Sequence, residues 1–156
     1  MSRSSATITV TSRLAAPPAA VWAHAATMEG VNFELRPLVR MTVPAAVRGK
    51  TLEDVELDTT AFHSVLLAGG VLPFDRHALR LVKVQPGRGF QERSTSLLHA
   101  RWEHERTIVA DGDGSLLTDR VTFEPRLGPA GLERAVVAAL FRHRHDRLTQ
   151  RFSMPR

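Results

Sequence analysis

One long β-hairpin, predicted over residues 100–125, constrains this chain more than any other feature. Its turn, Asp-Gly-Asp-Gly at 111–114, combines glycines that tolerate positive φ with aspartates whose side chains bond their own backbone. A hairpin centred on this turn pairs Ala110 with Ser115, and every other cross-strand pair follows from that one.

The two faces of this hairpin agree with a single register. One face pairs Ile108 with Leu117, Arg106 with Asp119, His104 with Val121 and Trp102 with Phe123. The other face pairs Thr107 with Thr118, Glu105 with Arg120, Glu103 with Thr122 and Arg101 with Glu124. Apolar and opposite-charge pairs directly across from each other stabilise a sheet, and a slip of one residue would exchange the two faces. We therefore predict that the first face points into the protein, although it carries several polar groups.

Length and composition indicate one globular domain, which we place at residues 1–156. The chain has 43% hydrophobic and 24% charged residues and no cysteine, which excludes disulfides, thiolate nucleophiles and cysteine metal sites. We expect a cytoplasmic protein, because the sequence contains neither the apolar core of a signal peptide nor an apolar run long enough to span a membrane. The net charge is +5, but acidic residues are interleaved with basic ones along the chain, so a nucleic acid or ribosome partner is not favoured.

Hydrophobic periodicity and turn residues divide the rest of the chain into short elements. Alternation predicts strands at 6–14, 38–43, 62–67, 79–84 and 90–95, with 45–59 irregular apart from a short strand near 53–57. A short helix is predicted to begin at Pro18, since proline suits the first helical position. We expect Gly30 to break this helix before a second helical turn at 31–35.

A long C-terminal helix is predicted from the turn at 128–131 to about residue 152. One apolar stripe of this helix consists of Val137, Phe141, Leu148 and Phe152. Arg144 falls in the middle of the stripe, and Leu140 and Val136 lie beside the stripe. The order of elements predicts an α+β fold in which a curved antiparallel sheet of about seven strands wraps this terminal helix, with two short helices after the first strand.

Several spaced motifs connect this pattern to a known superfamily. Phe90 stands twelve residues before Trp102-Glu103-His104, residues 114–125 read Gly-Ser-Leu-Leu-Thr-Asp-Arg-Val-Thr-Phe-Glu-Pro, and Phe141 stands three residues before Arg144. Over roughly residues 7–152 the chain resembles the START-like, Bet v 1-like superfamily of helix-grip proteins, in particular bacterial SRPBCC ligand-binding and polyketide cyclase-like members. One departure is Leu97-Leu98, where many relatives carry Gly-Pro.

The resemblance implies a cavity between the sheet and the C-terminal helix, with a small hydrophobic lipid-, polyketide- or aromatic-like ligand and no cofactor. The expected lining residues are Phe90, Trp102, His104, Val121, Phe123, Leu140 and Phe141. The alternative is a filled core, since small domains are normally close-packed. An apolar pocket with few polar groups is the kind of site that such a ligand requires.

The inward polar residues each allow a structural and a functional interpretation. Arg106 and Asp119 form either an ion pair that fixes the register or a polar anchor for a ligand, and Arg144 is included as a ligand-binding candidate. His104 is either a hydrogen-bonded core residue or a general acid or base, since its ordinary pKa is near neutral. Glu92 is predicted either to orient His104 or to pair with Arg106. Glu34 lies in the short-helix region that, in the superfamily that the chain resembles, often borders the cavity mouth, but we expect this side chain to be solvated.

Metal-dependent and nucleotide-dependent chemistry receive little support from the sequence. His143 and His145 are two residues apart on a helix and should point in different directions, and His99 and His104, five apart on a strand, should lie on opposite faces. The chain contains no His-Glu-x-x-His, no nucleophile elbow and no phosphate-cradling glycine loop.

Three functions are compatible with these observations. The leading hypothesis is a small-molecule binding protein with a hydrophobic cavity. The second is an enzyme of the cyclase, aromatase or dehydratase type that uses His104 with Asp119, Glu92 or Arg106. The third is an interaction module of the kind that associates with ribosomes or proteins. The oligomeric state and the identity of a ligand cannot be inferred from the residues.

Overall fold

Seven antiparallel strands form one sheet in the computed structural model, which describes residues 4–153. The first and last three residues of the predicted domain therefore lie outside the described residues. The strands follow the spatial order β1-β7-β6-β5-β4-β3-β2. Their bounds are β1 Ala6–Leu14, β2 Val39–Met41, β3 Thr60–Ala68, β4 Leu72–Gln85, β5 Gly89–Ser96, β6 His99–Asp111 and β7 Gly114–Pro125. The helices are α1 Pro18–Ala25, α2 Met28–Leu35 and α3 Ala130–Arg151, with short 3-10 turns η1 Ala45–Val47 and η2 Leu52–Asp54.

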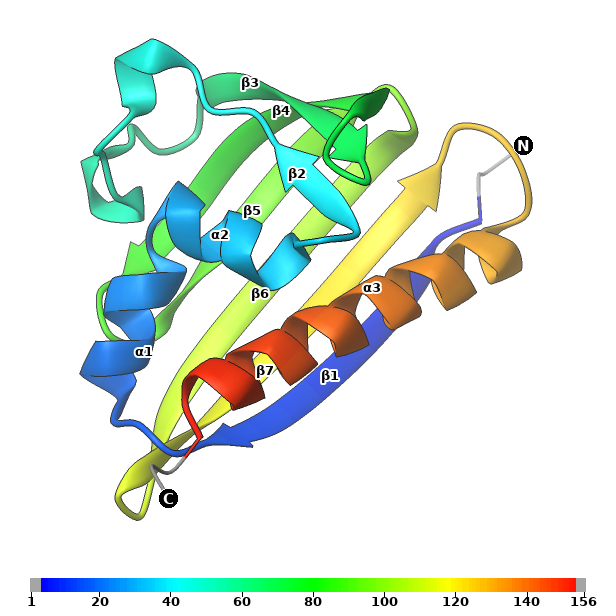
Figure 1. Ribbon diagram of the computed structural model, residues 1–156. Helices are drawn as coiled ribbons and strands as arrows, with labels where there is room; N and C mark the ends of the chain where they lie inside the picture. Colours follow the sequence, from blue (N-terminus) through cyan, green and yellow to red (C-terminus); the bar gives the residue numbers. More distant parts are fainter. Residues whose placement is uncertain (1–3, 154–156) are drawn as a thin grey trace.

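The helices cover only part of the concave face of this sheet. The long helix α3 lies along β1 and β7, α1 packs on β6 and β7, and α2 contacts β2 and α3 (Figure 1). Within residues 4–153, no helix packs extensively on β3, β4 or β5. The predicted α+β helix-grip arrangement is thus confirmed. Its helices pack mainly on β1, β7 and β6, which we call the covered half of the inner face, and we call the part formed by β3–β5 the open half.

The predicted hairpin is confirmed pair by pair. Strands β6 and β7 pair Arg106 with Asp119, and the remaining pairs from Arg101–Glu124 to Ala110–Ser115 also match the predicted register. One prediction about β6 is wrong. A register shift between His99 and Arg101 inserts an extra residue, so His99 lies on the same inner face as His104 instead of the opposite one.

Two other local predictions are also wrong. Gly30 does not break the first helix but lies inside α2, and the break falls at Ala26 and Thr27, whose hydroxyl caps α2 by accepting from the Gly30 N–H at 3.0 Å. A Cβ on Gly30 would lie 1.9 Å from the His24 carbonyl oxygen, so glycine is needed for this close approach of backbone. The strand expected near 53–57 is replaced by η2, which a capping box stabilises.

Two clusters of buried side chains fill the covered half. One lies under α1 and joins Leu14, Val21, Trp22, Ala26, Ile108, Leu117 and Leu148. The other lies under α3 and joins Ile8, Val121, Phe123, Val137 and Phe141. The predicted helix stripe is therefore buried at Val137, Phe141 and Leu148, whereas Val136 is 59% exposed. Within residues 4–153, no helix has the length and apolar character needed to cross a membrane.

Removing the Phe141 ring should destabilise the protein strongly. The side chain is 1% exposed, and we expect Phe141→Ala to lower the free energy of unfolding by about 3–5 kcal/mol, because it leaves a cavity in the core. Denaturant unfolding measures this change. The matched control is Val136→Ala on the same helix, which should cost less than about 0.5 kcal/mol because its side chain is exposed. Similar losses for both variants would contradict the packing of α3 on this face.

Candidate functional site

The predicted pair of Arg106 and Asp119 forms the centre of a buried charge network. The Arg106 Nε donates to Asp119 Oδ1 and its Nη2 donates to Asp119 Oδ2, each at 2.7 Å. Arg106 is 1% exposed and Asp119 is fully buried. The expectation that both face inward, opposite each other, is confirmed.

Glu34 completes this network from helix α2, so the prediction that it is solvated is wrong. It is fully buried, and its two oxygens accept from Arg106 at 2.7 and 3.0 Å. The Arg144 Nε from α3 donates to the same carboxylate at 3.1 Å. Nothing in the sequence near Glu34 indicates a partner that lies 72 positions further along the chain. A buried guanidinium next to a single carboxylate is, however, a signal that a second carboxylate is needed.

Asp119 also accepts from two histidines. His104 Nε2 lies 2.7 Å from Oδ1 and His145 Nε2 lies 2.8 Å from Oδ2. Because an ionised carboxylate only accepts hydrogen bonds, both histidines must carry a proton on Nε2. The Nδ1 atom of a neutral His145 is then an acceptor, and the Ser12 hydroxyl lies 2.8 Å from it. His104 and His145 therefore act as fixed donors that orient Asp119.

The neighbouring charges keep these buried groups ionised. Burial by itself would raise the pKa of Asp119, but Arg106 and then His104 hold it well below its usual range. Burial likewise opposes ionisation of Glu34, yet Arg106 and Arg144 lower the pKa of that carboxyl. The pKa of Arg106 is raised well above its usual value, because the attraction of Asp119 and Glu34 exceeds the effect of burial. The network thus holds alternating charges away from water.

A second polar group lies on the open half of the sheet, on β4 and β5. Glu92 accepts from His77 Nε2 at 2.5 Å and from the Ser94 hydroxyl at 2.6 Å. Its other oxygen lies 3.8 Å from His104 Nδ1, too far for a hydrogen bond but close enough for an electrostatic contact. Of the two predicted roles of Glu92, the structure therefore places it beside His104 and not in a pair with Arg106.

His77 and Glu92 each favour the charged form of the other. Burial would lower the pKa of His77, but Glu92, with a smaller contribution from Asp75, raises it above its usual value. Burial would raise the pKa of Glu92, and His77 and His104 together lower it instead. These directions favour an imidazolium bonded to a carboxylate. His77 was not predicted as a site residue, because its strand was expected only from residue 79.

A third group links the start of α3 to the sheet. His99 Nε2 lies 2.7 Å from Glu133 Oε1, and its Nδ1 lies 3.3 Å from the Ser96 hydroxyl. This contact exists because the extra residue in β6 turns His99 inward. The predicted divergence of His143 and His145 is confirmed, since His143 bonds the Arg36 carbonyl while His145 bonds Asp119. No cluster of metal-ligating side chains is found among residues 4–153.

The predicted aromatic lining is brought together but is mostly packed. Val121, Phe123 and Phe141 are at most 1% exposed, and His104 lies between the rings of Phe90 at 5.1 Å and Phe141 at 5.0 Å. Trp102 is only half-buried, with its ring 6.0 Å from Phe123 and 6.2 Å from His77. Phe90 and Leu140 are half-buried too. Whether these residues bind a ligand remains a prediction.

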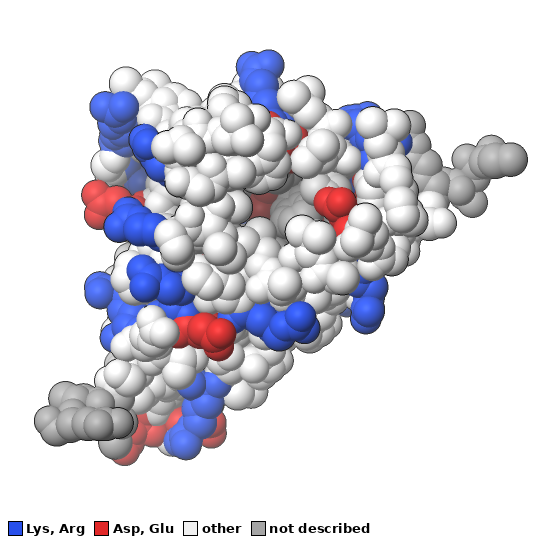
Figure 2. All heavy atoms as spheres, turned by 45° about the vertical axis from the view of Figure 1, so that its right-hand side comes forward, with Lys and Arg blue, Asp and Glu red and all other residues white. Residues whose placement is uncertain are grey.

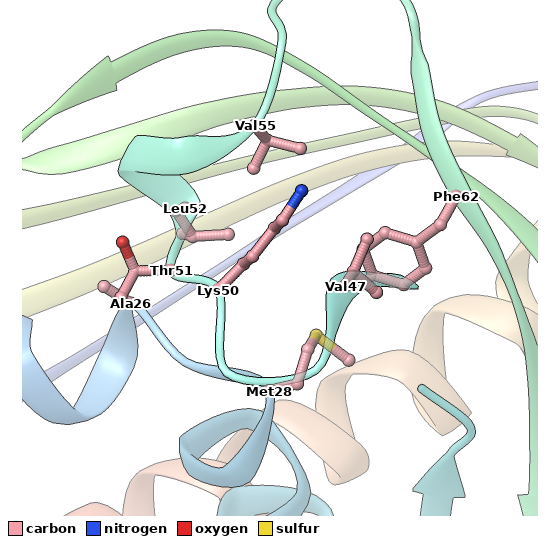
Figure 3. Close-up of a pocket in the computed structure, with 8 residues that line it drawn as sticks. All are labelled: Ala26, Met28, Val47, Lys50, Thr51, Leu52, Val55 and Phe62. Atoms are coloured by element: carbon pink, nitrogen blue, oxygen red, sulfur yellow. The ribbon is translucent and has the colours of Figure 1, made fainter. Parts of the chain in front are cut away.

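The surface opens at the end of the molecule where α3 begins. Figure 2 shows a hollow in this view, with acidic atoms inside it and at its rim. A separate, mainly apolar pocket lies between the α1–α2 junction, the 45–55 segment and β3; it is lined by Ala26, Met28, Val47, Lys50, Thr51, Leu52, Val55 and Phe62 (Figure 3). Its volume is about 30 Å³, which holds little more than a water molecule. In Figure 3 the Lys50 side chain runs across this pocket toward Val55. The pocket therefore has no room for a ligand in this structure.

Comparison with known protein families assigns the chain to one of them. A family model described as a domain of unknown function, DUF8410, matches residues 12–152. The chain belongs to the DUF8410 family. This match spans all three α-helices and every strand except residues 6–11 of β1. No curated protein matches the chain.

Solved structures show that this DUF8410 member has the START, Bet v 1-like fold. Protein CV1439 from Chromobacterium violaceum is 14% identical, with a TM-score of 0.72 over 96% of this chain and 99% of that one. A START superfamily protein from Mycobacterium smegmatis is 14% identical, with a TM-score of 0.69 over 94% and 96%. Ara h 8.0201 is 11% identical, with a TM-score of 0.63 over 96% and 98%. The predicted superfamily is thereby confirmed at the level of fold.

Neutralising one carboxylate of the network should be costly. Asp119→Asn keeps the size of the side chain but leaves Arg106 with one charged partner fewer, and it replaces one acceptor oxygen by an NH₂ donor that faces a histidine N–H. We expect the free energy of unfolding to fall by about 3–5 kcal/mol in chemical denaturation. The control is Glu103→Gln in the exposed pair with Arg101, whose loss should cost at most about 1 kcal/mol. Equal effects would show that the buried network does not hold the fold together.

The pair of His77 and Glu92 should make stability depend on pH. Since the folded state raises the pKa of His77 above its ordinary value of 6.5, its stabilising contribution is complete below that value and is lost as the pH rises through the folded pKa. The difference in unfolding free energy between the wild type and His77→Gln should therefore be largest near pH 6 and shrink toward pH 9. A control variant of the exposed His63, His63→Gln, should run parallel to the wild type. A difference that stays constant with pH would contradict the charged pair.

Proposed function

We propose that this protein binds a small hydrophobic molecule over the open half of the sheet, between β3–β5 and α3. The observation that carries the proposal is the uneven cover of the concave face. Helices pack on β1, β7 and β6, whereas no helix packs extensively on β3, β4 or β5 within residues 4–153. A concave sheet face that its own helices leave open is a natural site for a ligand. The hollow seen in Figure 2 lies at the end from which a ligand would enter.

The wall of this site combines apolar surface with a few polar groups. Leu140 shares a helix stripe with Glu133 and Arg144, which bond His99 on β6 and Glu34 on α2, so Leu140 lies on the side of α3 that faces the interior. Trp102 offers a large aromatic surface from the sheet. These two half-buried side chains are the predicted lining residues that are best placed to contact a ligand.

Exposed aliphatic side chains gather at the same end of the molecule. They lie where α2 meets β2, in the β3–β4, β5–β6 and β7–α3 connections, and on the first turns of α3. They are Leu38, Val71, Leu72, Leu97, Leu98, Leu127, Leu132 and Val136, all at least 40% exposed. Groups of exposed apolar side chains are typical of interaction sites, and here they would give an apolar ligand a path from solvent into the hollow.

The contacts of His104 favour binding over catalysis by that residue. Its Nε2 proton is held by Asp119, its Nδ1 faces Glu92, and it is 4% exposed between two phenylalanine rings. A general acid or base must reach the proton that it moves, either directly or through one water. His104 would have to break the charge network to do so.

A neutral fluorescent dye tests this proposal. N-phenyl-1-naphthylamine emits more strongly in apolar surroundings, and the wild type should bind it saturably. Leu140→Arg, which places a charged side chain in the wall, should weaken the dissociation constant at least about 10-fold, because burying a charge without a partner is unfavourable.

The control for this experiment is Val109→Arg, an exposed position on β6 near the opposite end of the hairpin. It should bind the dye like the wild type. Absence of saturable binding by the wild type, or equal losses in the two variants, would overturn the proposed function. Native mass spectrometry of the purified protein gives a second readout, since a co-purified ligand should be reduced in Leu140→Arg.

A further inference from the structure

We infer that His77 and Trp102 form a site for an acceptor oxygen on a flat apolar ligand, such as the carbonyl of an aromatic ketone. This inference rests on the proposed function, because it names the part of the site that would select the ligand. It assigns a role to His77 that the sequence did not indicate, and a polar role to Trp102.

The first observation is that each of the two residues has a ring nitrogen without a hydrogen-bond partner. His77 uses Nε2 for Glu92, and its Nδ1 makes no hydrogen bond within residues 4–153. The indole nitrogen of Trp102 makes none within that range either. Neither nitrogen is a buried atom without a partner. Among the described residues, the buried side-chain nitrogen that lacks a hydrogen bond is His24 Nε2. The two nitrogens are therefore open to solvent, although His77 is buried and Trp102 is half-buried.

The second observation is the position of the two rings. They stand edge to face, with centroids 6.2 Å apart and planes at 89°. His77 lies on β4 and Trp102 on β6, and β5 separates them, so both project from the concave face over the open half of the sheet. Two neighbouring rings, each with an unpartnered nitrogen, match a ligand that combines a flat body with one acceptor oxygen.

The third observation is that Glu92 fixes the donor. The carboxylate is held by the Ser94 hydroxyl at 2.6 Å and bonds His77 Nε2, so the imidazole is oriented and, when charged, presents an Nδ1–H. The pair of His77 and Glu92 carries no net charge in this state. A neutral acceptor such as a carbonyl can therefore bind without bringing an unbalanced charge into the site.

A pair of neutral probes of equal shape isolates the oxygen. These are 2-acetylnaphthalene and 2-isopropenylnaphthalene, in which a C=O group replaces a C=CH₂ group. Equilibrium dialysis at pH 6 measures both dissociation constants. The wild type should bind the ketone at least about 10-fold more tightly, which is the effect of one or two hydrogen bonds to a charged or neutral donor.

Three variants complete the test. His77→Gln retains an N–H for Glu92 but no ring Nδ1, and Trp102→Phe retains an aromatic surface but no N–H. Each should reduce the ratio of the two dissociation constants, which measures the preference for the ketone, to less than about 3-fold, whatever its effect on the affinity for the hydrocarbon. His63→Gln, on the exposed side of β3, should keep the full preference. Circular dichroism establishes that each variant is folded.

The outcomes separate the inference from the proposed function. Equal affinity of the wild type for both probes would overturn the inference and leave hydrophobic binding intact. A ketone preference that survives in both His77→Gln and Trp102→Phe would also overturn it. If neither probe binds the wild type, the site itself fails and both proposals fall together.

Discussion

The structure depends on the ion pairs of one buried guanidinium, that of Arg106. Arg106 is 1% exposed, so its charge must be balanced inside the protein, and the two carboxylates that balance it come from β7 and α2. Arg144 then ties α3 to the same Glu34. One buried charge thereby connects the sheet, a short helix and the long helix. Such a network contributes specificity more than net stability, because desolvation offsets much of its attraction.

The sequence predicted what is local, and it missed what depends on distant partners. The hairpin register followed from pairs such as Glu105 with Arg120, because cross-strand neighbours near a tight turn are fixed by that turn. Glu34 and His145 join the network only after the chain has folded, from positions 72 and 26 residues away from their partners. Periodicity cannot indicate such contacts, and it also fails at an inserted residue, as the orientation of His99 shows.

The division of the inner face explains why fold and function require separate arguments. The covered half holds the apolar clusters and the charge network, and it accounts for the packing of α1 and α3. Structures only 11–14% identical to this chain share its fold, so the arrangement of strands and helices tolerates nearly complete exchange of side chains. A fold this tolerant does not specify a ligand. The proposed selection of a ligand rests instead on side chains on the open half, His77 and Glu92, and on Trp102 from the neighbouring strand β6.

The extra residue in β6 has a consequence for comparing this chain with its relatives. His99 pairs with Pro125 and Arg101 with Glu124, so Ala100 has no residue of β7 opposite it. A homologue that lacks this insertion would match residue by residue from Arg101 onward, yet every position before it would be offset by one. An ungapped alignment would then equate inward with outward side chains at the start of the strand. Whether relatives keep the contact between His99 and Glu133 can be judged only after a gap is placed at Ala100.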